Sequence, residues 1–535
     1  MAVTSAAHPE RGEVLARLAE ARTWDLVVIG GGATGVGVAL DAASRGYTVA
    51  LLEQHDFGKG TSSRSTKLVH GGVRYLEQGN VPLVMGALRE RGLLRRNAPH
   101  LVHELPFVVP SYDWWESPFY GIGLKVYNAL AGRWGFGPSE ILSRDEVLAR
   151  LPTIRTDGLR GGVVYHDGQF DDARLLVNMV QTAAAHGAAL ANYVEVAALV
   201  VGADGFVDGV VARDVEGGRE WTLRARVVVN ATGAFADAVR RMAHADAEPM
   251  VAPSQGVHLV FDGSFLPGGS AIMVPHTSDG RVLFAIPWHD HTLVGTTDTA
   301  IDEPTLEPVA MPDEVAFILE TAGQYLHRAP AAVDVRSVFA GIRPLVRAAG
   351  KGTAALSRDH TIHVDPSGLL TIAGGKWTTW RHMAEDVVDH ASELGHLEPR
   401  ACVTRELPIH GSTGAEPHDP ASATFGGDLR VYGGDAPAIR DLQSRDPSLA
   451  AALHPALPYT GAEVVWAVRA EMARTVEDVL ARRLRALFLD ARAAIAMAPR
   501  VARLMAVELD RDDAWAVHEV ARFAGVAAHY RLPGT

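Results

Sequence analysis

One glycine-rich turn near the N-terminus constrains the fold more than any other feature of this sequence. A strand-like apolar run over residues 24–29 leads into the turn, and a helical segment and a second strand-like run follow at 36–45 and 48–52. The turn has the spacing Gly-x-Gly-x-x-Gly and consists of Gly30, Gly32 and Gly35. This strand–turn–helix–strand order predicts a βαβ unit, whose two strands run parallel because a helical crossover joins them.

The same turn predicts a binding site for a dinucleotide. Its glycines permit a close approach of the backbone to a pyrophosphate, which the positive end of the following helix attracts. Glu53 ends the second strand, where a carboxylate accepts hydrogen bonds from ribose hydroxyls. A glycine triplet alone is often an ordinary loop, but here the whole strand–turn–helix–strand–acid context is present. The turn by itself does not distinguish NAD from FAD.

The remaining sequence favours FAD over NAD. Instead of further strand–helix repeats, short strands separated by turn signals run from 192 to 230 and end at Ala231-Thr-Gly233. Gly374 and Gly375 then form a second glycine-rich turn from a strand into a helix. In many two-domain flavoproteins such a helix points its N-terminus at the flavin, where its positive end stabilises the anionic reduced ring. We therefore expect a flavoprotein.

Composition excludes several classes of partner and site. The net charge of −13 argues against non-specific binding of nucleic acid, and it requires an anionic substrate to meet a local cluster of cations. A single cysteine, Cys402, rules out an internal disulfide and a cysteine-ligated iron–sulfur cluster. His289-Asp-His291 has a metal-like spacing, but no further ligands lie near it in sequence, so we expect a turn and no metal.

The remaining elements are predicted from local patterns. No apolar run reaches the roughly 18 residues of a membrane-spanning helix and no signal peptide is recognisable, so we expect a cytoplasmic protein that is soluble or peripheral. We expect a mostly helical stretch up to about residue 150, a β-rich block over 251–298, a linker over 411–426, and helices over 463–489 and 491–507. The helix over 463–489 either packs against the main body or lies on anionic lipid, because it interleaves apolar residues with Arg469, Arg474, Arg482, Arg483 and Arg485.

One long segment is more distinctive than any of these patterns. It reads Gly60-Thr-Ser-Ser-Arg-Ser-Thr-Lys-Leu-Val-His-Gly-Gly-Val-Arg-Tyr75. Together with residues 30–41 and Gly374-Gly-Lys-Trp-Thr-Thr379, it closely resembles FAD-dependent glycerol-3-phosphate dehydrogenase of the aerobic bacterial and mitochondrial kind. The resemblance covers about residues 24–525 and includes motifs at 165–169, 256–258, 295–298, 341–345, 357–359, 459–463 and 482–483. His166 and Asp171 depart from the usual Tyr and Asn of the family, outside the motifs assigned to chemistry.

The resemblance implies a fold and a reaction. The fold is α/β, with an FAD-binding, Rossmann-like domain over 24–400 and a small helical C-terminal domain over 401–535. An antiparallel substrate-capping sheet interrupts the first domain, with strands mainly within 80–170 and 245–345. The reaction is oxidation of sn-glycerol 3-phosphate to dihydroxyacetone phosphate, with hydride transfer to flavin N5 and electrons passed to a membrane quinone. The resemblance further implies a peripheral enzyme in contact with lipid on the inner face of the cell membrane, and it leaves a homodimer open.

By the same resemblance, Arg74, Arg358 and Lys376 bind the substrate phosphate, and Arg343 stabilises the oxyanion that develops at the hydroxyl end. Surface salt bridges are the alternative for these cations. His258 is the candidate base for the C2 hydroxyl, although a lone histidine in a strand is often structural. FAD is expected to bind non-covalently, without a covalent bond to His70. Its expected contacts are Gly30, Gly32, Gly35, Glu53, Thr61, Ser62, Ser63, Ser65, Lys67, His70, Gly71, Val196, Gly233, Gly375, Thr378 and Thr379.

Other functions remain open on the sequence alone. A glycerol-3-phosphate oxidase would pass the electrons to oxygen. A related flavoprotein could act on an amino acid, but several cationic motifs suit a phosphate better than a zwitterion. A non-catalytic flavin-binding protein is the third alternative, and the intact set of candidate catalytic and phosphate-binding residues argues against it.

Overall fold

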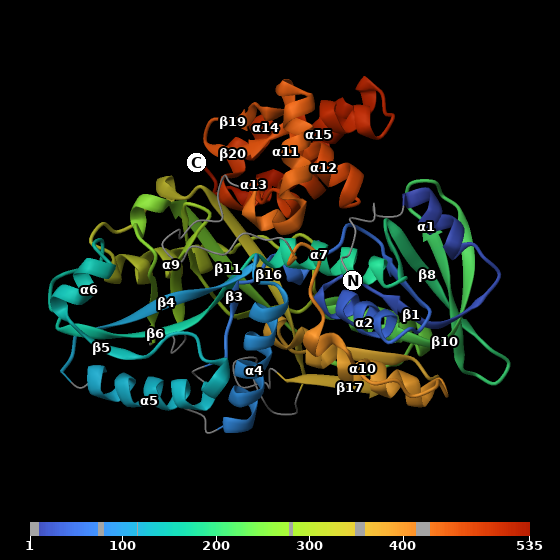
Figure 1. The fold of residues 1–535 in the computed structure, drawn as a ribbon, viewed down its shortest axis with the longest axis horizontal. Helices are drawn as coiled ribbons and strands as arrows, with labels where there is room; N and C mark the ends of the chain where they lie inside the picture. The colour runs from blue at the N-terminus through green and yellow to red at the C-terminus, as the bar shows by residue number, and fades with distance from the viewer. Residues whose placement is uncertain are drawn as a thin grey trace.

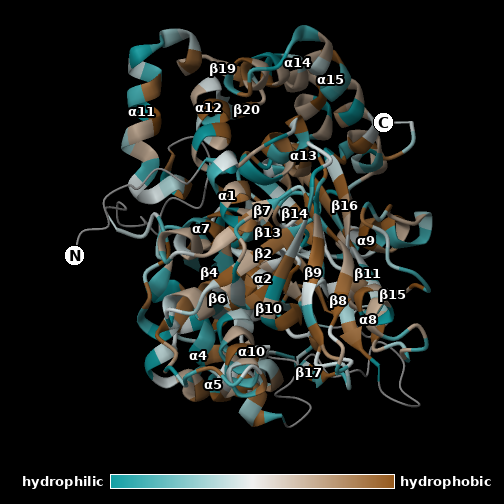
Figure 2. Ribbon diagram, turned by 90° about the vertical axis from the view of Figure 1, so that its right-hand side faces the viewer, coloured by the Kyte–Doolittle hydropathy of each residue, from teal (hydrophilic) through white to brown (hydrophobic). Residues whose placement is uncertain are grey.

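Two β-sheets and a group of helices at one end make up the molecule (Figure 1). The structure, a computed structural model, describes residues 10–72, 80–114, 116–275, 277, 282–347, 359–413 and 429–534. The sheets lie side by side, and the helices formed by the last hundred or so residues lie across one end of them (Figures 1 and 2).

The first sheet is parallel at its centre. Its main strands follow the order β17-β18-β10-β1-β2-β7, and β1 pairs in parallel with both β2 and β10. Helix α2 (Ala33–Ser44) is the crossover between β1 and β2, so the predicted βαβ unit and the predicted α/β class are confirmed. The strands are β1 (Thr23–Ile29), β2 (Val49–Glu53), β7 (Ala189–Asn192), β8 (Val194–Val201), β9 (Val207–Asp214), β10 (Glu220–Asn230), β17 (His360–Val364) and β18 (Leu370–Gly374).

The central strands of this sheet are apolar toward their carboxyl ends, where both faces are covered. On one face, Leu26 and Val28 of β1 pack with α2, α7 (Asp172–Ala185) and α10 (Trp380–Leu394). On the other face, Val27 and Ile29 pack with the layer formed by β8, β9 and α1 (Arg11–Leu18). Polar and glycine residues lie at the carboxyl ends of the parallel strands: Gly30 follows β1, Glu53 ends β2 and Asn230 ends β10.

The second sheet is mostly antiparallel. Its strands follow the order β15-β11-β14-β13-β12-β4-β6-β3, with β16 beside β11 and β5 beside β6. They are β3 (Leu68–Val69), β4 (Val102–Ser111), β5 (Glu140–Ser143), β6 (Gly161–Phe170), β11 (Val251–Asp262), β12 (Ala271–Val274), β13 (Leu283–Trp288), β14 (His291–Gly295), β15 (Thr299–Ala300) and β16 (Ser337–Val346). The helices around this sheet are α4 (Val81–Asn97), α5 (Glu116–Ala131), α6 (Arg144–Arg150) and α9 (Pro312–Tyr325).

The stretch before residue 150 is less helical than we predict from the sequence. Strand β4 lies in the middle of the second sheet and pairs with β6 along its whole length. Its two prolines, Pro106 and Pro110, hide the strand in the sequence, because proline is depleted in inner strands. Burial of Phe107, Val108 and Val109 and the pairing with β6 outweigh that preference.

The described residues from 436 to 534 contain a short hairpin and five α-helices. They are α11 (Ala436–Arg445), β19 (Ala452–His454), β20 (Leu457–Thr460), α12 (Gly461–Ala470), α13 (Ala486–Leu489), α14 (Ala491–Glu508) and α15 (Asp513–Ala527). A further helix, α8 (Ala236–Ala243), lies earlier in the chain, after β10. The predicted helix over 491–507 is confirmed as α14. The prediction of one helix over 463–489 is wrong, because Asp478 accepts hydrogen bonds from the N–H groups of Arg474 (2.8 Å) and Thr475 (3.0 Å) and so starts a separate π-helical segment.

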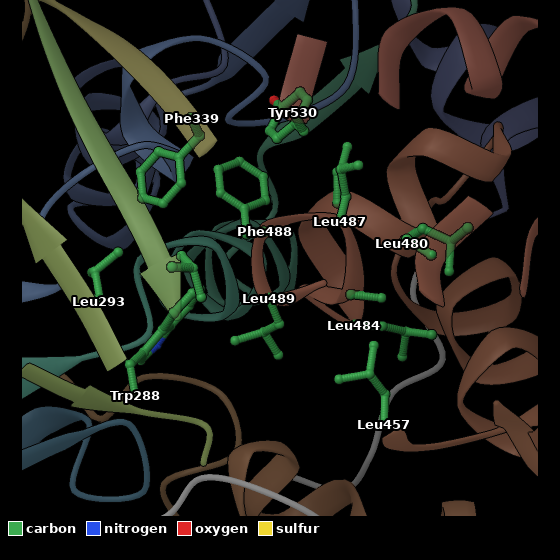
Figure 3. Close-up of a cluster of buried hydrophobic side chains, with 14 of the residues drawn as sticks. Trp288, Leu293, Phe339, Leu457, Leu480, Leu484, Leu487, Phe488, Leu489 and Tyr530 are labelled. Atoms are coloured by element: carbon green, nitrogen blue, oxygen red, sulfur yellow. The ribbon is translucent and has the colours of Figure 1, made fainter. Parts of the chain in front are cut away.

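The largest hydrophobic core joins the second sheet to these helices. Trp288 of β13 and Phe339 of β16 are buried in one cluster with Phe488 and Leu489 of α13 (Figure 3). Each fully buried side chain of this size contributes about 1.5–3 kcal/mol relative to exposure. We therefore expect the C-terminal helices to be an integral part of the folded protein.

Candidate active site

The glycine turn lies where the strand order of the first sheet reverses. From β1 the chain crosses to β2 on one side, and β10 lies on the other side, so the carboxyl ends of the three strands meet at one edge. Ligands of open α/β sheets bind in the crevice at such a switch point. The turn is packed tightly there: a Cβ on Gly30 would lie 2.8 Å from the carbonyl oxygen of Ala231, and one on Gly35 would lie 1.9 Å from that of Gly30. Gly30 also has a φ of +105°, which favours glycine.

The groups expected around a pyrophosphate and a ribose surround the N-terminus of α2. The N–H of Ala33, in the first turn of that helix, donates to Ser62 Oγ (2.9 Å). A Cβ on Gly32 would lie 3.1 Å from the same hydroxyl, so the Ser62 side chain lies directly against this glycine. Glu53 accepts the N–H of Gly31 (2.7 Å), and burial raises the pKa of its carboxyl group. The small residues of the turn, the positive end of the α2 dipole and the carboxylate of Glu53 together fit the diphosphate and ribose of FAD.

The loop after Gly60 runs from this helix terminus to the second sheet. Thr61 Oγ1 donates to the carbonyl of Ile342 in β16 (2.6 Å), and Ser65 Oγ donates to Asp172 (2.7 Å). Thr66 Oγ1 lies 2.9 Å from Nε2 of His258 in β11. One short segment therefore connects the predicted pyrophosphate site to the candidate base.

The end of this loop meets the second glycine turn. The N–H of His70 donates to Thr378 Oγ1 (3.1 Å), and the N–H of Gly71 donates to the hydroxyl of Tyr127 (2.8 Å). Thr378 and Thr379 belong to the 3-10 turn that starts α10, directly after Gly375 with its φ of +76°. The structure thus brings the two predicted glycine-rich segments together. Among the other expected cofactor contacts, Gly233 follows β10 at the same edge, and Val196 lies in β8, which contacts β2.

His258 is buried and neutral. Its ring stacks on Phe339 of the paired strand, with centroids 4.9 Å apart and an angle of 16° between the planes. Burial lowers the pKa of the imidazole well below its ordinary value, and the charges of Lys67 and Arg343 lower it further. Nδ1 is buried without a hydrogen-bond partner among the described residues. Nδ1 can accept a proton in the tautomer in which Nε2–H donates to Thr66 Oγ1.

Arg343 lies on the same face of the second sheet. Its guanidinium donates to the carbonyl of Thr297 (2.9 Å) and to Thr296 Oγ1 (3.0 Å), and it lies 3.6 Å from Asp298. A Cβ on Gly256 would lie 2.4 Å from Nη2, so the guanidinium lies directly against this glycine. Gly256 and His258 are two residues apart in β11 and therefore face the same way.

Only part of the predicted phosphate site lies in the described chain. Lys376 immediately follows Gly375 and precedes the 3-10 turn at the start of α10, which places it at the same edge as the glycine turns. Arg74 and Arg358 lie outside the described residues. For these two arginines, phosphate binding stays a prediction.

The side chain of Lys67 points into the protein and is paired there with Asp172. Its Nζ is fully buried and donates to Asp172 Oδ2 (2.6 Å) and to the carbonyl of Ser63 (2.8 Å). Arg485 donates to the same two residues from the C-terminal helices. Sequence reasoning missed Asp172 and the contact that Arg485 makes with it, because no local pattern marks a contact between segments so far apart in the chain. Thr66 was also missed, although it stands inside the distinctive segment over 60–75.

The arginines of the predicted helix over 463–489 form ion pairs with the protein. Arg482 and Arg483 are buried and both bind Asp56, three residues after Glu53. Arg485 is buried as well, Arg474 pairs with Glu216 and Arg469 pairs with Glu508. Of the two alternatives, packing against the main body is therefore correct for this segment.

His289 and Asp290 form the turn between β13 and β14, as the sequence predicts. Both have positive φ, 47° and 59°, which matches the two central residues of a tight hairpin. His289 Nε2 lies 3.2 Å from Asp171. Within the described ranges, no group of three or more His, Cys, Asp and Glu side chains is arranged to hold a metal ion.

Comparison with known proteins identifies the family. The model of the FAD dependent oxidoreductase family matches residues 25–408, and that of the C-terminal domain of alpha-glycerophosphate oxidase matches 402–516. The chain is 41% identical to the probable mitochondrial glycerol-3-phosphate dehydrogenase of Caenorhabditis elegans and 40% identical to the mitochondrial glycerol-3-phosphate dehydrogenase of Homo sapiens. Each alignment covers 94% of this chain and 73% of the relative.

A solved structure agrees with these relatives. The glycerol-3-phosphate dehydrogenase from Bacillus halodurans, complexed with FAD, is 29% identical, has a TM-score of 0.79 and matches over 99% of both chains. The expected resemblance, fold class and cofactor are confirmed by these findings. This chain belongs to the FAD-dependent glycerol-3-phosphate dehydrogenases.

Proposed function

We propose that this chain oxidises sn-glycerol 3-phosphate to dihydroxyacetone phosphate with non-covalently bound FAD and passes the electrons to a membrane quinone. The observation that carries the proposal is the placement of His258 and Arg343. They share one face of the second sheet, and the loop that contacts His258 through Thr66 also contacts the N-terminus of α2 through Ser62. A base and a cation thus stand beside the dinucleotide site.

The chemistry divides between the cofactor and the chain. FAD, when bound, accepts the hydride that leaves C2 of the substrate. Nδ1 of His258 takes the proton of the C2 hydroxyl, while Thr66 holds Nε2 and so fixes the orientation of the ring. The guanidinium of Arg343 stabilises the negative charge that develops on the C2 oxygen.

Binding of the phosphate requires cations in an otherwise acidic protein. Lys376, at the start of the turn into α10, supplies one charge beside the dinucleotide edge. Arg74 and Arg358 are proposed to complete the site, because two guanidinium groups can bind phosphate oxygens bidentately. Glycerol, which lacks the phosphate, should therefore be a poor substrate.

We further propose a peripheral contact with lipid at α5, on the inner face of the cell membrane. The described residues contain no helix long and apolar enough to cross a bilayer. Around α5, however, large apolar side chains are exposed: Trp114 (78%), Phe119 (54%), Ile122 (69%) and Val126 (45%). Phe119, Ile122 and Val126 recur at helical spacing on one face, next to the exposed Lys125, which is the pattern of an interfacial helix. In Figures 1 and 2, α5 lies at the end of the molecule opposite the C-terminal helices.

A second candidate function is an oxidase that passes electrons to oxygen. It is favoured by the match of residues 402–516 to the C-terminal domain of alpha-glycerophosphate oxidase. The test compares turnover with a soluble quinone analogue against formation of peroxide in air, each with and without anionic liposomes. The dehydrogenase predicts fast quinone reduction that liposomes enhance, with little peroxide. Peroxide formed in equal amount to the substrate consumed, at the quinone-supported rate and without an effect of lipid, would establish the oxidase instead.

A further inference from the structure

We propose that the C-terminal helices position the ring of His258 through two side chains, Arg485 and Phe488. This proposal rests on the proposed function, in which His258 is the base. Two chains of contacts lead from these side chains to the imidazole. One runs through Lys67 to the hydrogen bond on Nε2, and the other runs through Phe339 to the face of the ring.

Lys67 is a buried amine that is held from two sides, and burial lowers its pKa to about 7, so it carries its full charge only below that pH. Besides its hydrogen bonds to Asp172 and Ser63, its Nζ lies 5.1 Å from the ring centroid of Phe339 and 5.4 Å from that of Phe488. A desolvated ammonium group near aromatic rings at this distance is attracted by their quadrupoles. These contacts hold the backbone of Lys67 at a φ of 64°, which residues other than glycine seldom adopt.

Arg485 provides the second half of this arrangement. Its Nη2 donates to Asp172 Oδ1 (3.0 Å) and to the carbonyl of Ser63 (2.9 Å), and its guanidinium lies 4.3 Å from the ring centroid of Phe488. Asp172 thus divides its two oxygens between Lys67 and Arg485. Both contacts stabilise this buried carboxylate, because a buried charge is unfavourable unless it is paired and hydrogen-bonded. The C-terminal helices are therefore tied to the loop just before Thr66.

The loop and the aromatic contact both end at the imidazole. Thr66 follows the segment that Arg485 holds, and its Oγ1 lies 2.9 Å from His258 Nε2. Phe339 stacks on the His258 ring, and Phe488 packs edge-on against Phe339 with centroids 4.9 Å apart (Figure 3). The hydrogen bond to Nε2 and the stacking of Phe339 on the ring therefore both depend on residues 485–488. A base that moves by about 1 Å can lose about 10²-fold in rate, even when the substrate still binds.

The first test uses the full-length holoenzyme and compares Phe488→Ala and Phe488→Leu with Met505→Ala. Met505 is equally buried and lies in α14, which packs against α12, α13 and α15, so its loss controls for destabilisation of the helices. We expect both Phe488 variants to retain FAD and to bind substrate with little change. The limiting rate of anaerobic flavin reduction should fall by roughly 10- to 100-fold in Phe488→Ala and by less in Phe488→Leu. Met505→Ala should reduce its flavin at the wild-type rate.

The second test changes the charge next to the base. Lys67→Met keeps the length of the side chain and leaves Arg485 on Asp172, but it removes a positive charge that opposes protonation of His258. The acid limb of the profile of reduction rate against pH should move to higher pH. A merely structural role of Lys67 would lower stability without moving that limb.

Each outcome decides the proposal. Wild-type rates in both Phe488 variants would overturn the proposal. An unmoved pH profile in Lys67→Met would overturn the part of it that runs through Lys67. An equal loss of rate in Met505→Ala would also overturn it, because the effect would then reflect stability and not positioning. Failure of the proposed function would look different: the wild-type flavin would not be reduced by sn-glycerol 3-phosphate, or His258→Ala would be reduced as fast as the wild type.

Discussion

At the scale of single residues, burial gives His258 the properties that its proposed role as the base requires. An exposed imidazole is partly protonated near neutral pH, but burial and the charges of Lys67 and Arg343 keep this one neutral. Gly295 makes room for it, since a Cβ there would lie 2.3 Å from His258 Cδ2. The sequence alone predicts this histidine only through its resemblance to a family. The contact with Thr66 joins residues 192 positions apart, so no local pattern reveals it.

Removal of the imidazole should affect the chemical step and not the cofactor. We expect His258→Ala to slow flavin reduction at saturating substrate by roughly 10²- to 10⁴-fold, the range typical of a general base. Stopped-flow measurement without oxygen gives this rate directly. FAD content and substrate affinity serve as controls, and reduction at the wild-type rate would show that the base lies elsewhere.

The lowered pKa of His258 predicts how the rate of flavin reduction should change with pH. A base whose pKa is lowered stays neutral, and therefore competent, as the pH falls through 6.5, the ordinary value for histidine. We expect the limiting rate of flavin reduction in the wild type to stay level through this region and to decline only at lower pH. A decline centred at pH 6.5 or above would contradict the assignment of this buried histidine as the base.

At the scale of secondary-structure elements, the unit β1–α2–β2 is the most predictable part of the molecule. Its apolar runs and glycine spacing are local, and each strand must be apolar because both faces are covered. The segment after α12 is the least predictable. Its arginines have the spacing of a lipid-binding helix, and only the distant carboxylates of Asp56 and Asp172 reveal that they are internal ion pairs.

The glycine turn offers a test at this scale. A Cβ on Gly32 would already lie 3.1 Å from Ser62 Oγ, and the branched side chain of valine would fill the space above the N-terminus of α2. We expect Gly32→Val to fold but to purify largely without flavin. Gly60→Ala is a matched control, because a Cβ there meets nothing within 4 Å. A fully yellow Gly32→Val protein would contradict the proposed position of the pyrophosphate.

At the scale of the whole molecule, the proposed contact with lipid depends on the surface charge and on the position of α5. The net charge of −13 opposes general attraction to anionic lipid, so attachment must depend on a local apolar surface. The exposed face of α5 is such a surface, and it lies far from the C-terminal helices in both views (Figures 1 and 2). The sequence did not predict this site, because Phe119, Ile122 and Val126 look like core residues until the fold shows them exposed.

A charge on this face should release the protein from lipid. We expect Ile122→Glu to weaken binding to anionic liposomes severalfold or more, because burying a carboxylate at the interface is unfavourable. Flotation of protein with vesicles measures this binding. Val517→Glu, at a position of α15 that is 71% exposed, is the matched control and should bind as the wild type does. Unchanged flotation of Ile122→Glu would place the membrane contact on another surface.

The central claim is that this chain oxidises sn-glycerol 3-phosphate through its flavin. The most direct measurement mixes the purified, FAD-loaded protein with sn-glycerol 3-phosphate in the absence of oxygen and follows the absorbance of the flavin. We expect complete bleaching, formation of dihydroxyacetone phosphate in an amount equal to the flavin reduced, and little effect of glycerol at the same concentration. A flavin that keeps its oxidised spectrum with sn-glycerol 3-phosphate, or that bleaches equally well with glycerol, would contradict the claim.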